Sequence, residues 1–416
     1  MKHTPQLFIT APRVQLMFVF PLFLFSLIVI PSISQIDYNK FISPSPTASS
    51  LGKYGDVPVS LYTGTPNVSI PLGALTGTEL ELPISLSYMA RGVKVEENAS
   101  WVGTGWSLNA GGVITCTIRG HEDAAAKPRP VFPMPLSAAD KSSILLNIQH
   151  NVYDPEPDLF FFNLPGHSGS FVLDANGKAV LDDAKDIRIV RDNVNKYKFT
   201  ITVENGTQYV FDKIENTSYG SLGGVAGIYL SKIISPTGKE VIDFTYAEEL
   251  TKFYSLSRPV KRIRPGNITI DAFPAAFGIT TINSLRLERI TTNFGGNILF
   301  IPDSISRKDL GLVAESVAPR ALRAIHFYDR DSVVKKRFDL QYDMIETARP
   351  YAQTGRGDPP ADQNTMYANY RLYLKSVREV SGDRTIQNPP YVFRYDGRTD
   401  TNLDLLPSKL SAAQDH

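Results

Sequence analysis

The chain has 416 residues, 42% of them hydrophobic, and it carries 43 lysines and arginines against 42 aspartates and glutamates. This composition is that of a folded protein, and the length exceeds the size at which a single hydrophobic core usually stops growing. We therefore expect two domains or one elongated β-body. The near-equal charge balance does not provide the basic surface that nucleic acid requires, so we expect no nucleic-acid partner.

Residues 1–34 are predicted to be an export signal that does not belong to the fold. Basic residues precede an apolar run of 15 residues, 16–30, and the small residues Ser32 and Ser34 stand where a signal peptidase reads the chain. The run is short against the roughly 20 residues needed to cross a bilayer. We expect cleavage between Ser34 and Gln35 and a secreted or cell-surface protein with no membrane span after cleavage. Retention of the segment as an anchor is the alternative.

Cys116 is the only cysteine, so no disulfide can form within the chain. It lies in a β-branched stretch, 114–118, and we expect a small buried residue there. A catalytic thiol would need a histidine partner, and His121 is the nearest in sequence. We interpret Cys116 as structural, and stability must then come from the hydrophobic core.

The strand pattern is densest between residues 82 and 120. Ile84, Leu86 and Tyr88 alternate with polar or flexible neighbours, which is typical of a strand with one buried face. Three further segments continue the pattern, and together they predict a meander: 93–96, 107–109 and 113–118.

Both tryptophans of the chain, Trp101 and Trp106, bracket a WVGTGW turn in this stretch. Small and apolar residues surround them, so we expect the two indoles to pack beneath the sheet. The alternative is a glycan-binding surface, because sugars stack on exposed aromatic faces. Neither interpretation requires a nucleophile or a base in the turn.

Local signals predict the elements of the next hundred residues. Ser137 with Asp140 is a helix-capping pattern for a short helix through Asn147. A turn at 165–169, Pro-Gly-His-Ser-Gly, predicts a hairpin between two aromatic-rich strands, and Asn205 with Gly206 predicts a second. Residues 174–178 predict a turn, since an EF-hand would require a glycine and a distal glutamate that are absent.

The C-terminal half contains a degenerate repeat of four units. Each unit begins with Leu-x-x-Ile or Leu-x-x-Val, continues through a polar turn and returns as an aromatic strand, so each is predicted to be a hairpin. A single hairpin cannot bury its apolar face, and we expect the units to stack. Their irregular spacing favours an extended sheet with inserted loops over a propeller. The units begin at Leu230, Leu287, Leu322 and Leu374.

Two segments, LGKYGDVPVSLYTGTPNVSIPL at 51–72 and LELPISLSYMARGVKVEENASWVGTGWSLNAGGVIT at 80–115, resemble the N-terminal region of secreted Bacteroidetes RHS/YD-repeat proteins. More distantly, this region is similar to the lead-in of SpvB-like and Tc-toxin shell proteins. Tyr-Asp pairs that begin at Tyr328, Tyr342 and Tyr395 resemble the dipeptide that names the YD repeats. In that family, such hairpins lead into a long β-sheet that spirals into a hollow shell. Cys116 departs from the resemblance, since we would expect an arginine at that position.

We therefore predict an all-β protein, with a β-rich, sandwich-like N-terminal module followed by a stacked β-hairpin array of RHS/YD type. The predicted parts are a signal peptide at 1–34, a flexible leader at 35–48, the N-terminal module at 49–219, the hairpin array at 220–396 and a polar tail at 397–416, where the gene product would be truncated.

No catalytic, cofactor or metal pattern is recognisable in the sequence. The GHSG stretch at 166–169 lacks the strand and helix of a nucleophile elbow, and paired carboxylates are typical of solvated turns. The resemblance implies a non-enzymatic structural part of an exported shell that encapsulates a toxin or contacts a cell surface. Its partners would be downstream RHS/YD repeats or a partner β-chain, with a surface glycan or a toxin cargo as further candidates. The alternatives are a glycan-binding adhesin module and a hydrolase with an unrecognised site.

The predicted export signal gives the first testable expectation. The secreted protein should begin at Gln35, because the small residues Ser32 and Ser34 follow the apolar run directly. Intact-mass measurement of secreted material checks this. A product that retains Met1, or one that stays in the membrane fraction, would contradict the prediction.

Overall fold

The computed structural model describes residues 67–89, 94–119, 122, 135, 137–150, 152–182, 186–219, 222–257, 260–263, 270–273, 276–350, 365–396 and 404–409. All of them belong to one compact unit, Pro58–His416. The predicted signal peptide, its cleavage site at Ser34 and Gln35, and the predicted leader at 35–48 lie outside the described residues.

The described part of the chain is mostly β, as predicted, and its strands form three sheets. The first sheet contains β1 (Asn67–Thr76), β2 (Glu81–Met89) and β3 (Trp106–Asn109). The second contains sixteen strands: β4 (Val113–Thr117), β5 (Leu159–Leu164), β6 (His167–Leu173), β7 (Ala179–Leu181), β8 (Arg188–Arg191), β9 (Phe199–Thr202), β10 (Gln208–Tyr219), β11 (Leu222–Ile234), β12 (Val241–Ser257), β15 (Ala276–Thr292), β16 (Asn297–Ser306), β17 (Arg320–Tyr328), β18 (Val334–Arg349), β19 (Tyr370–Ser381), β20 (Tyr391–Val392) and β21 (Asp404–Pro407). The third is the hairpin of β13 (Val260–Ile263) and β14 (Ile270–Phe273), and the helical segments are α3 (Ala138–Gln149), η3 (Glu315–Val317) and η4 (Met366–Asn369).

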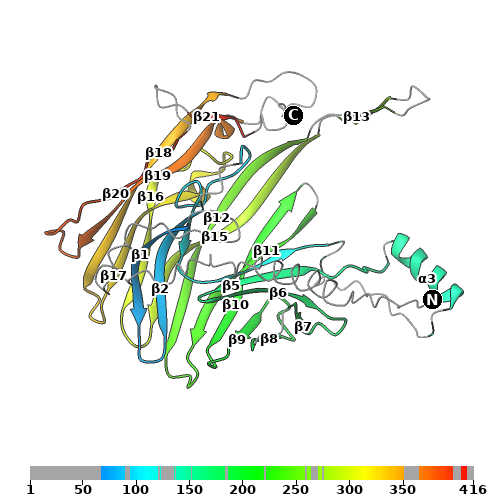
Figure 1. The fold of residues 1–416 in the computed structure, drawn as a ribbon, viewed down its shortest axis with the longest axis horizontal. Coiled ribbons are helices and arrows are strands. Elements are labelled where there is room, and N and C mark those ends of the chain that lie inside the picture. The colour runs from blue at the N-terminus through cyan, green and yellow to red at the C-terminus, as the bar shows by residue number, and fades with distance from the viewer. Residues whose placement is uncertain are drawn as a thin grey trace, which may run out of the picture. The chain divides into compact units, whose positions relative to one another are not determined.

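The four predicted repeat units are antiparallel hairpins of the large sheet. They are β11 with β12, β15 with β16, β17 with β18 and β19 with β20. Consecutive units also pair with each other, so the eight strands form one antiparallel meander. Figure 1 shows β16 to β20 at the left of the view, with β12 and β15 beside them. The hairpin β13–β14 is an insertion between β12 and β15.

A β-bulge explains the Leu-x-x-Ile signature of the repeat. In a regular strand, residues three apart point to opposite faces, yet Leu322 and Ile325 are both 0% exposed while Arg323 is exposed. The pairing of β17 with β16 skips one residue at Arg323, which returns Leu322 and Ile325 to the same face. The same skip occurs at Ser231, Glu288 and Lys375 in the other units.

Tyrosine hydroxyls satisfy the carbonyl groups at three of these bulges. Tyr246 donates to the carbonyl of Leu230, Tyr342 to that of Leu322 and Tyr395 to that of Leu374, each at 2.7 Å. The second unit has Pro302 where the other units have the tyrosine, and Pro302 lies opposite Leu322 of the third unit. In two of the predicted Tyr-Asp pairs, the tyrosines Tyr342 and Tyr395 therefore serve to satisfy the carbonyl group at a bulge. The third pair differs, because Asp329 caps the β17–β18 turn through its own carboxylate.

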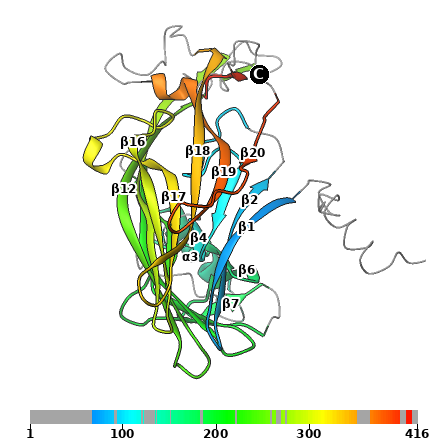
Figure 2. The same ribbon diagram turned by 90° about the vertical axis from the view of Figure 1, so that its left-hand side faces the viewer.

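The small sheet shares one hydrophobic core with the meander. Its buried residues Leu72, Leu82 and Ile84 belong to the same cluster as Phe300 and Leu322. Figure 2 shows β1 and β2 as a layer separate from β16 and β17. The sheet within the predicted module at 49–219 thus packs on strands of the predicted array at 220–396. The boundary between these two parts falls between the paired strands β10 and β11, so strands from both sides share one sheet.

The carboxylate of Glu240 fastens the β1–β2 turn to the β11–β12 turn. It accepts the backbone N–H groups of Thr78, Glu79 and Leu80 at 2.7, 2.9 and 2.9 Å. A β-carbon on Gly77 would lie only 2.3 Å from this carboxylate, so any other residue there would displace the Glu240 side chain from the turn. Hydrogen bonds to a charged acceptor are stronger than those to a neutral one.

Two parts of the predicted meander at 82–120 are wrong. Lys94, Val95 and Glu96 lie in a turn instead of a strand, with the N–H of Glu97 bonded to the carbonyl of Lys94. Strands β3 and β4 also do not pair, because β4 leaves the small sheet and joins β5 and β11 in the large one. Between β3 and β4, the chain passes from one sheet to the other at Gly111 and Gly112, which pack closely against neighbouring strands.

Local predictions in the middle of the chain are confirmed. Ser137 caps α3, with a capping box that involves Asp140, although the helix continues past Asn147 to Gln149. The hairpin β5–β6 forms as predicted, but its turn is only Pro165 and Gly166 instead of 165–169, because β6 already begins at His167. The hairpin β9–β10 turns at Asn205 and Gly206, where Gly206 has a φ of +87°, a value that favours glycine.

The segment predicted as a polar tail, 397–416, is packed in its described part. Strand β21 pairs in parallel with β18, and Ser408 and Lys409 are buried. The ammonium of Lys409 donates to the carbonyl of Asp309 at 2.7 Å, and the carboxylate of Asp309 pairs with Arg307 at 2.7 Å. Burial lowers the pKa of Lys409 to about 8, in spite of the nearby Asp309 carboxylate.

Deletion of Arg323 tests the bulge. If Arg323 is the extra residue of the bulge, its removal leaves Leu322 and Ile325 two apart in a regular ladder, and both stay on the buried face. We therefore expect the loss in the free energy of unfolding to stay well below the roughly 3 kcal/mol that would follow if one of the two side chains turned toward solvent. The control Arg323→Ala keeps the bulge and removes only an exposed side chain, and it should change stability by less than about 0.5 kcal/mol. Urea unfolding of both variants is the measurement. A deletion that costs about 3 kcal/mol or more would contradict the role of the bulge.

Candidate functional site

The candidate site is a cavity between two crossing two-stranded ribbons. Ribbon β10–β11 and ribbon β12–β15 are hydrogen-bonded to each other at two places. Residues 232–234 pair with 241–243 at one end, and residues 216–219 pair with 280–283 at the other. Different strands make the two junctions, so the ribbons cross, and a cavity of about 730 Å³ is lined by residues from both. This volume lies within the range of small-molecule sites.

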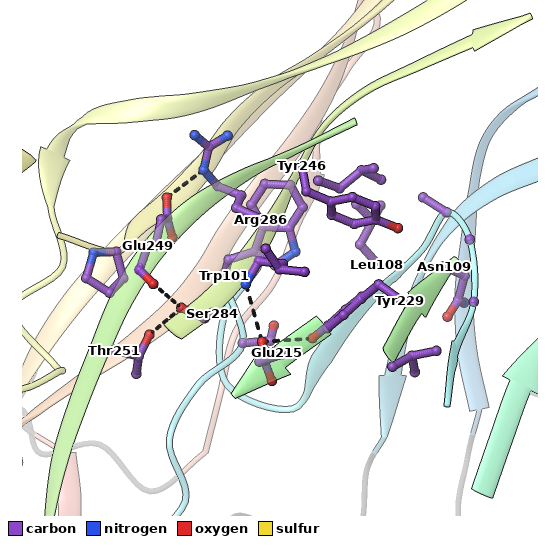
Figure 3. Close-up of a pocket in the computed structure, with 18 of the residues that line it drawn as sticks. Trp101, Leu108, Asn109, Glu215, Tyr229, Tyr246, Glu249, Thr251, Ser284 and Arg286 are labelled. Carbon is purple, nitrogen blue, oxygen red and sulfur yellow. Dashed lines mark hydrogen bonds and ion pairs between the residues drawn. The ribbon is translucent and has the colours of Figure 1, made fainter. Parts of the chain in front are cut away.

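The N-terminal segment lines the remaining side of the cavity. Trp101, Leu108 and Asn109 contribute side chains, followed by the crossing residues Gly111 and Gly112 (Figure 3). A β-carbon on Gly112 would lie 2.8 Å from the carbonyl oxygen of Asn163, so no other residue fits without displacing the β5 backbone. These glycines let the chain pass between the two sheets against the cavity.

An ion pair crosses the β12–β15 ribbon inside the cavity. The Nε of Arg286 donates to Oε1 of Glu249 at 2.5 Å, and the two side chains are only 12% and 11% exposed. Ser284 lies opposite Glu249 in the ladder and donates to its backbone carbonyl. Burial raises the pKa of Glu249, although Arg286 opposes this by favouring the carboxylate. The Nη1 atom of Arg286 is buried and has no hydrogen-bond partner among the described residues.

Glu215 lies on the other ribbon, at the middle of β10. Its Oε2 accepts the hydroxyl of Tyr229 at 3.2 Å and the backbone N–H of Leu285 at 3.3 Å. Burial raises the pKa of Glu215, and these two hydrogen bonds oppose the rise only in part. Tyr229 in turn packs against Tyr246, with ring centroids 5.6 Å apart. Figure 3 shows these residues around one opening, with Trp101 between the two ribbons.

The two tryptophans lie in different environments. Trp106 is 4% exposed, its ring packs on Phe393 at 4.6 Å between centroids, and its Nε1 donates to the hydroxyl of Tyr395 at 2.8 Å. Trp101 is half-buried, packs near Phe300 and lines the cavity. The two indoles therefore do not present one shared exposed face, and Trp101 alone borders a space that a ligand can occupy.

The WVGTGW turn that carries Trp101 is held on the meander by its backbone. Leu322 N–H donates to the carbonyl of Trp101 at 2.9 Å, and Thr104 donates both its N–H and its hydroxyl to the carbonyl of Leu372. Gly103 has a φ of +106° and leaves no room for a β-carbon, which would lie 2.9 Å from the backbone nitrogen of Leu374. The turn thus bridges β17 and β19 and fixes the position of Trp101.

Other residues singled out in the sequence do not come together here. Cys116 is half-buried against the main core, and His167 lies near the surface with its Nε2 3.0 Å from Glu204. Among the described residues, no group of histidine, cysteine, aspartate or glutamate side chains could hold a metal ion. The cavity residues Glu215 and Arg286 were not predicted. In the sequence, the only indication of these two site residues is that each is a charged residue within a long strand pattern.

Comparison of the chain with protein-family models gives no match, and a search of curated proteins gives none either. In the described part of the chain, no helix has the length and hydropathy needed to cross a membrane. The function therefore has to be inferred from the geometry of the chain itself.

Glu215→Gln tests whether burial of this carboxylate costs stability. Because the folded pKa of Glu215 is raised, folding favours its protonated form, and the contribution of Glu215 to stability is highest below the unfolded pKa of about 4.3. It should fall as the pH rises through the raised folded pKa, by about 1.4 kcal/mol for each tenfold difference in proton affinity between the folded and the unfolded carboxylate. The variant has no such loss, so its advantage over wild type should grow between pH 4 and pH 8 in urea unfolding.

The matched control is Glu248→Gln, which removes an exposed carboxylate from the neighbouring ribbon β12–β15, outside the cavity. It should follow the wild-type pH profile within about 0.5 kcal/mol. A Glu215→Gln protein that is less stable than wild type at pH 8 would show that the charge itself is needed for folding.

Proposed function

We propose that the chain is a non-enzymatic structural part of an exported RHS/YD-repeat shell, which serves toxin encapsulation and delivery or contact with a cell surface. The observation that carries the proposal is the repeated unit interface of the meander. Export follows from the predicted signal at 1–34, and the shell follows from the resemblance of 51–72 and 80–115.

Each unit offers the same edge to the next one. The tyrosine position of one unit lies opposite the bulged leucine of the following unit, as in Tyr246 with Leu287 and Tyr342 with Leu374. The interface therefore depends on a short backbone pattern and not on the length of the connecting loops. A sheet built in this way can be extended by any hairpin that carries the same signature.

The outer edge of β20 is the place where this extension would continue. Tyr395 occupies the position that Tyr342 has in the preceding unit, with the same hydrogen bond to the leucine of its own hairpin. No strand of the described ranges pairs with the outer side of β20, and Val392 is 61% exposed. Because Phe393 N–H bonds inward to Lys375, the backbone groups of Val392 point outward. The partner we propose is another hairpin of the same type, in the same or a partner chain.

The small sheet supports the same role. It covers the inner side chains of the meander, while the carboxylate of Glu240 and the turn at Trp101 bind it to strands from different units. An N-terminal segment fixed in this way would close the beginning of a shell wall. The toxin cargo and the cell-surface contact follow from the resemblance.

Val392→Lys tests the proposed edge. Exposed edge strands recruit further strands, so the protein with residues 35–416 should self-associate at tens of micromolar, a range chosen because such edges associate at roughly micromolar levels and above. A lysine at the edge should keep the protein monomeric in light scattering. The control Val194→Lys adds the same charge at a 94% exposed turn position and should leave self-association unchanged. A monodisperse wild-type monomer at this concentration would show that the edge is covered and would contradict the proposal.

A further inference from the structure

The charges that line the cavity leave one carboxylate without a counter-ion. Three arginines line the cavity, and each has its own carboxylate partner. Arg286 pairs with Glu249 at 2.5 Å, Arg307 with Asp309 at 2.7 Å and Arg320 with Glu315 at 3.2 Å. Glu215 is a further acidic residue that the ribbons bring here, and none of these arginines pairs with it.

The hydrogen bonds of Glu215 come from neutral donors. They are the hydroxyl of Tyr229 and the backbone N–H of Leu285, and both reach the same oxygen, Oε2. Burial of a carboxylate is unfavourable unless a positive charge compensates it. The raised pKa of Glu215, caused mainly by burial, reflects this cost. A cation bound in the cavity would remove it.

Aromatic side chains form a large part of the wall near this carboxylate. Tyr229 and Tyr246 lie 5.6 Å apart between ring centroids, and Trp101 borders the same cavity (Figure 3). The hydroxyls of both tyrosines are already engaged, one with Glu215 and one with the carbonyl of Leu230. What these residues offer a ligand is therefore their rings, whose electron-rich faces attract cations, most strongly in tryptophan.

We propose that the cavity binds a small organic ammonium cation, with Glu215 as its counter-ion and Trp101, Tyr229 and Tyr246 as its aromatic wall. The site is independent of the unit interface at the β20 edge. It adds a ligand-binding activity to the proposed structural role.

Other ligand classes fit the cavity less well. An anion would find a donor at the unpartnered Nη1 of Arg286, but the charge of that guanidinium is already balanced by Glu249, and the anion would add to the charge of Glu215. A neutral sugar could stack on Trp101 but would leave Glu215 uncompensated. Asn98 also lines the cavity, and its Oδ1 is a buried acceptor with no hydrogen-bond partner among the described residues.

Titration calorimetry with choline, ethanolamine, 3,3-dimethyl-1-butanol and methyl glucoside tests the proposal. The butanol has the shape of choline without its charge. We expect at least one of the two ammonium compounds to bind, and the neutral compounds to bind at least about tenfold more weakly, because they cannot compensate the charge of Glu215. Choline and ethanolamine separate a methylated from a primary ammonium, and either result supports the cation site.

Variants assign the binding to the cavity. Glu215→Gln keeps the shape and the acceptor for Tyr229 and should weaken ammonium binding about tenfold or more, with no effect on the neutral isostere. Trp101→Leu should weaken it several-fold. The control Glu248→Gln should leave it unchanged. Urea unfolding of each variant at the pH of the titration shows that the protein is folded.

Three outcomes would overturn the proposal. They are equal binding of choline and its neutral isostere, tighter binding of methyl glucoside than of both ammonium compounds, and unchanged ammonium binding in a folded Glu215→Gln protein. Absence of heat with both ammonium compounds at millimolar concentration would also reject it. None of these results bears on self-association through β20, so the two proposals fail separately.

Discussion

The β-bulge at each repeat leucine is the constraint on which the rest of the fold depends. A bulge releases backbone groups from the ladder, and a buried carbonyl or N–H left without a partner costs about 1–3 kcal/mol. Tyrosine hydroxyls satisfy the carbonyls of Leu230, Leu322 and Leu374. The N–H groups of Leu230 and Leu322 instead donate to the carbonyls of Gly112 and Trp101. The meander and the N-terminal segment thus complete each other, which explains why they share one core.

The features that could be predicted from the sequence are those that near neighbours decide. The turn at Asn205 and Gly206 depends on the φ preferences of two residues, and the cap of α3 on Ser137 and Asp140 alone. The repeat could also be found, because a bulge leaves a local trace. Two apolar residues three apart, such as Leu322 and Ile325, do not fit a regular strand with one buried face, and the same spacing recurs in each unit.

The cavity could not be predicted, because it is made by pairing between distant segments. Nothing in the strand pattern of 216–219 indicates that it joins 280–283, and only that junction brings Glu215 close to the backbone of Leu285. The exit of β4 from the small sheet has the same origin, since its partner β11 follows more than a hundred residues later. Periodicity tells which face of a strand is buried but not which strand covers it.

The two junctions between the crossing ribbons have a consequence for molecular recognition. Strands β10, β11, β12 and β15 form a closed circuit of hydrogen-bonded ladders, so the ribbons cannot hinge apart unless a ladder breaks. The walls that they provide are preorganised, and a ligand does not have to order them on binding. A cavity with such walls selects by fit and charge and adapts little to what it holds. The turn that carries Trp101 is hydrogen-bonded to β17 and β19, so the N-terminal side of the cavity is fixed in the same way.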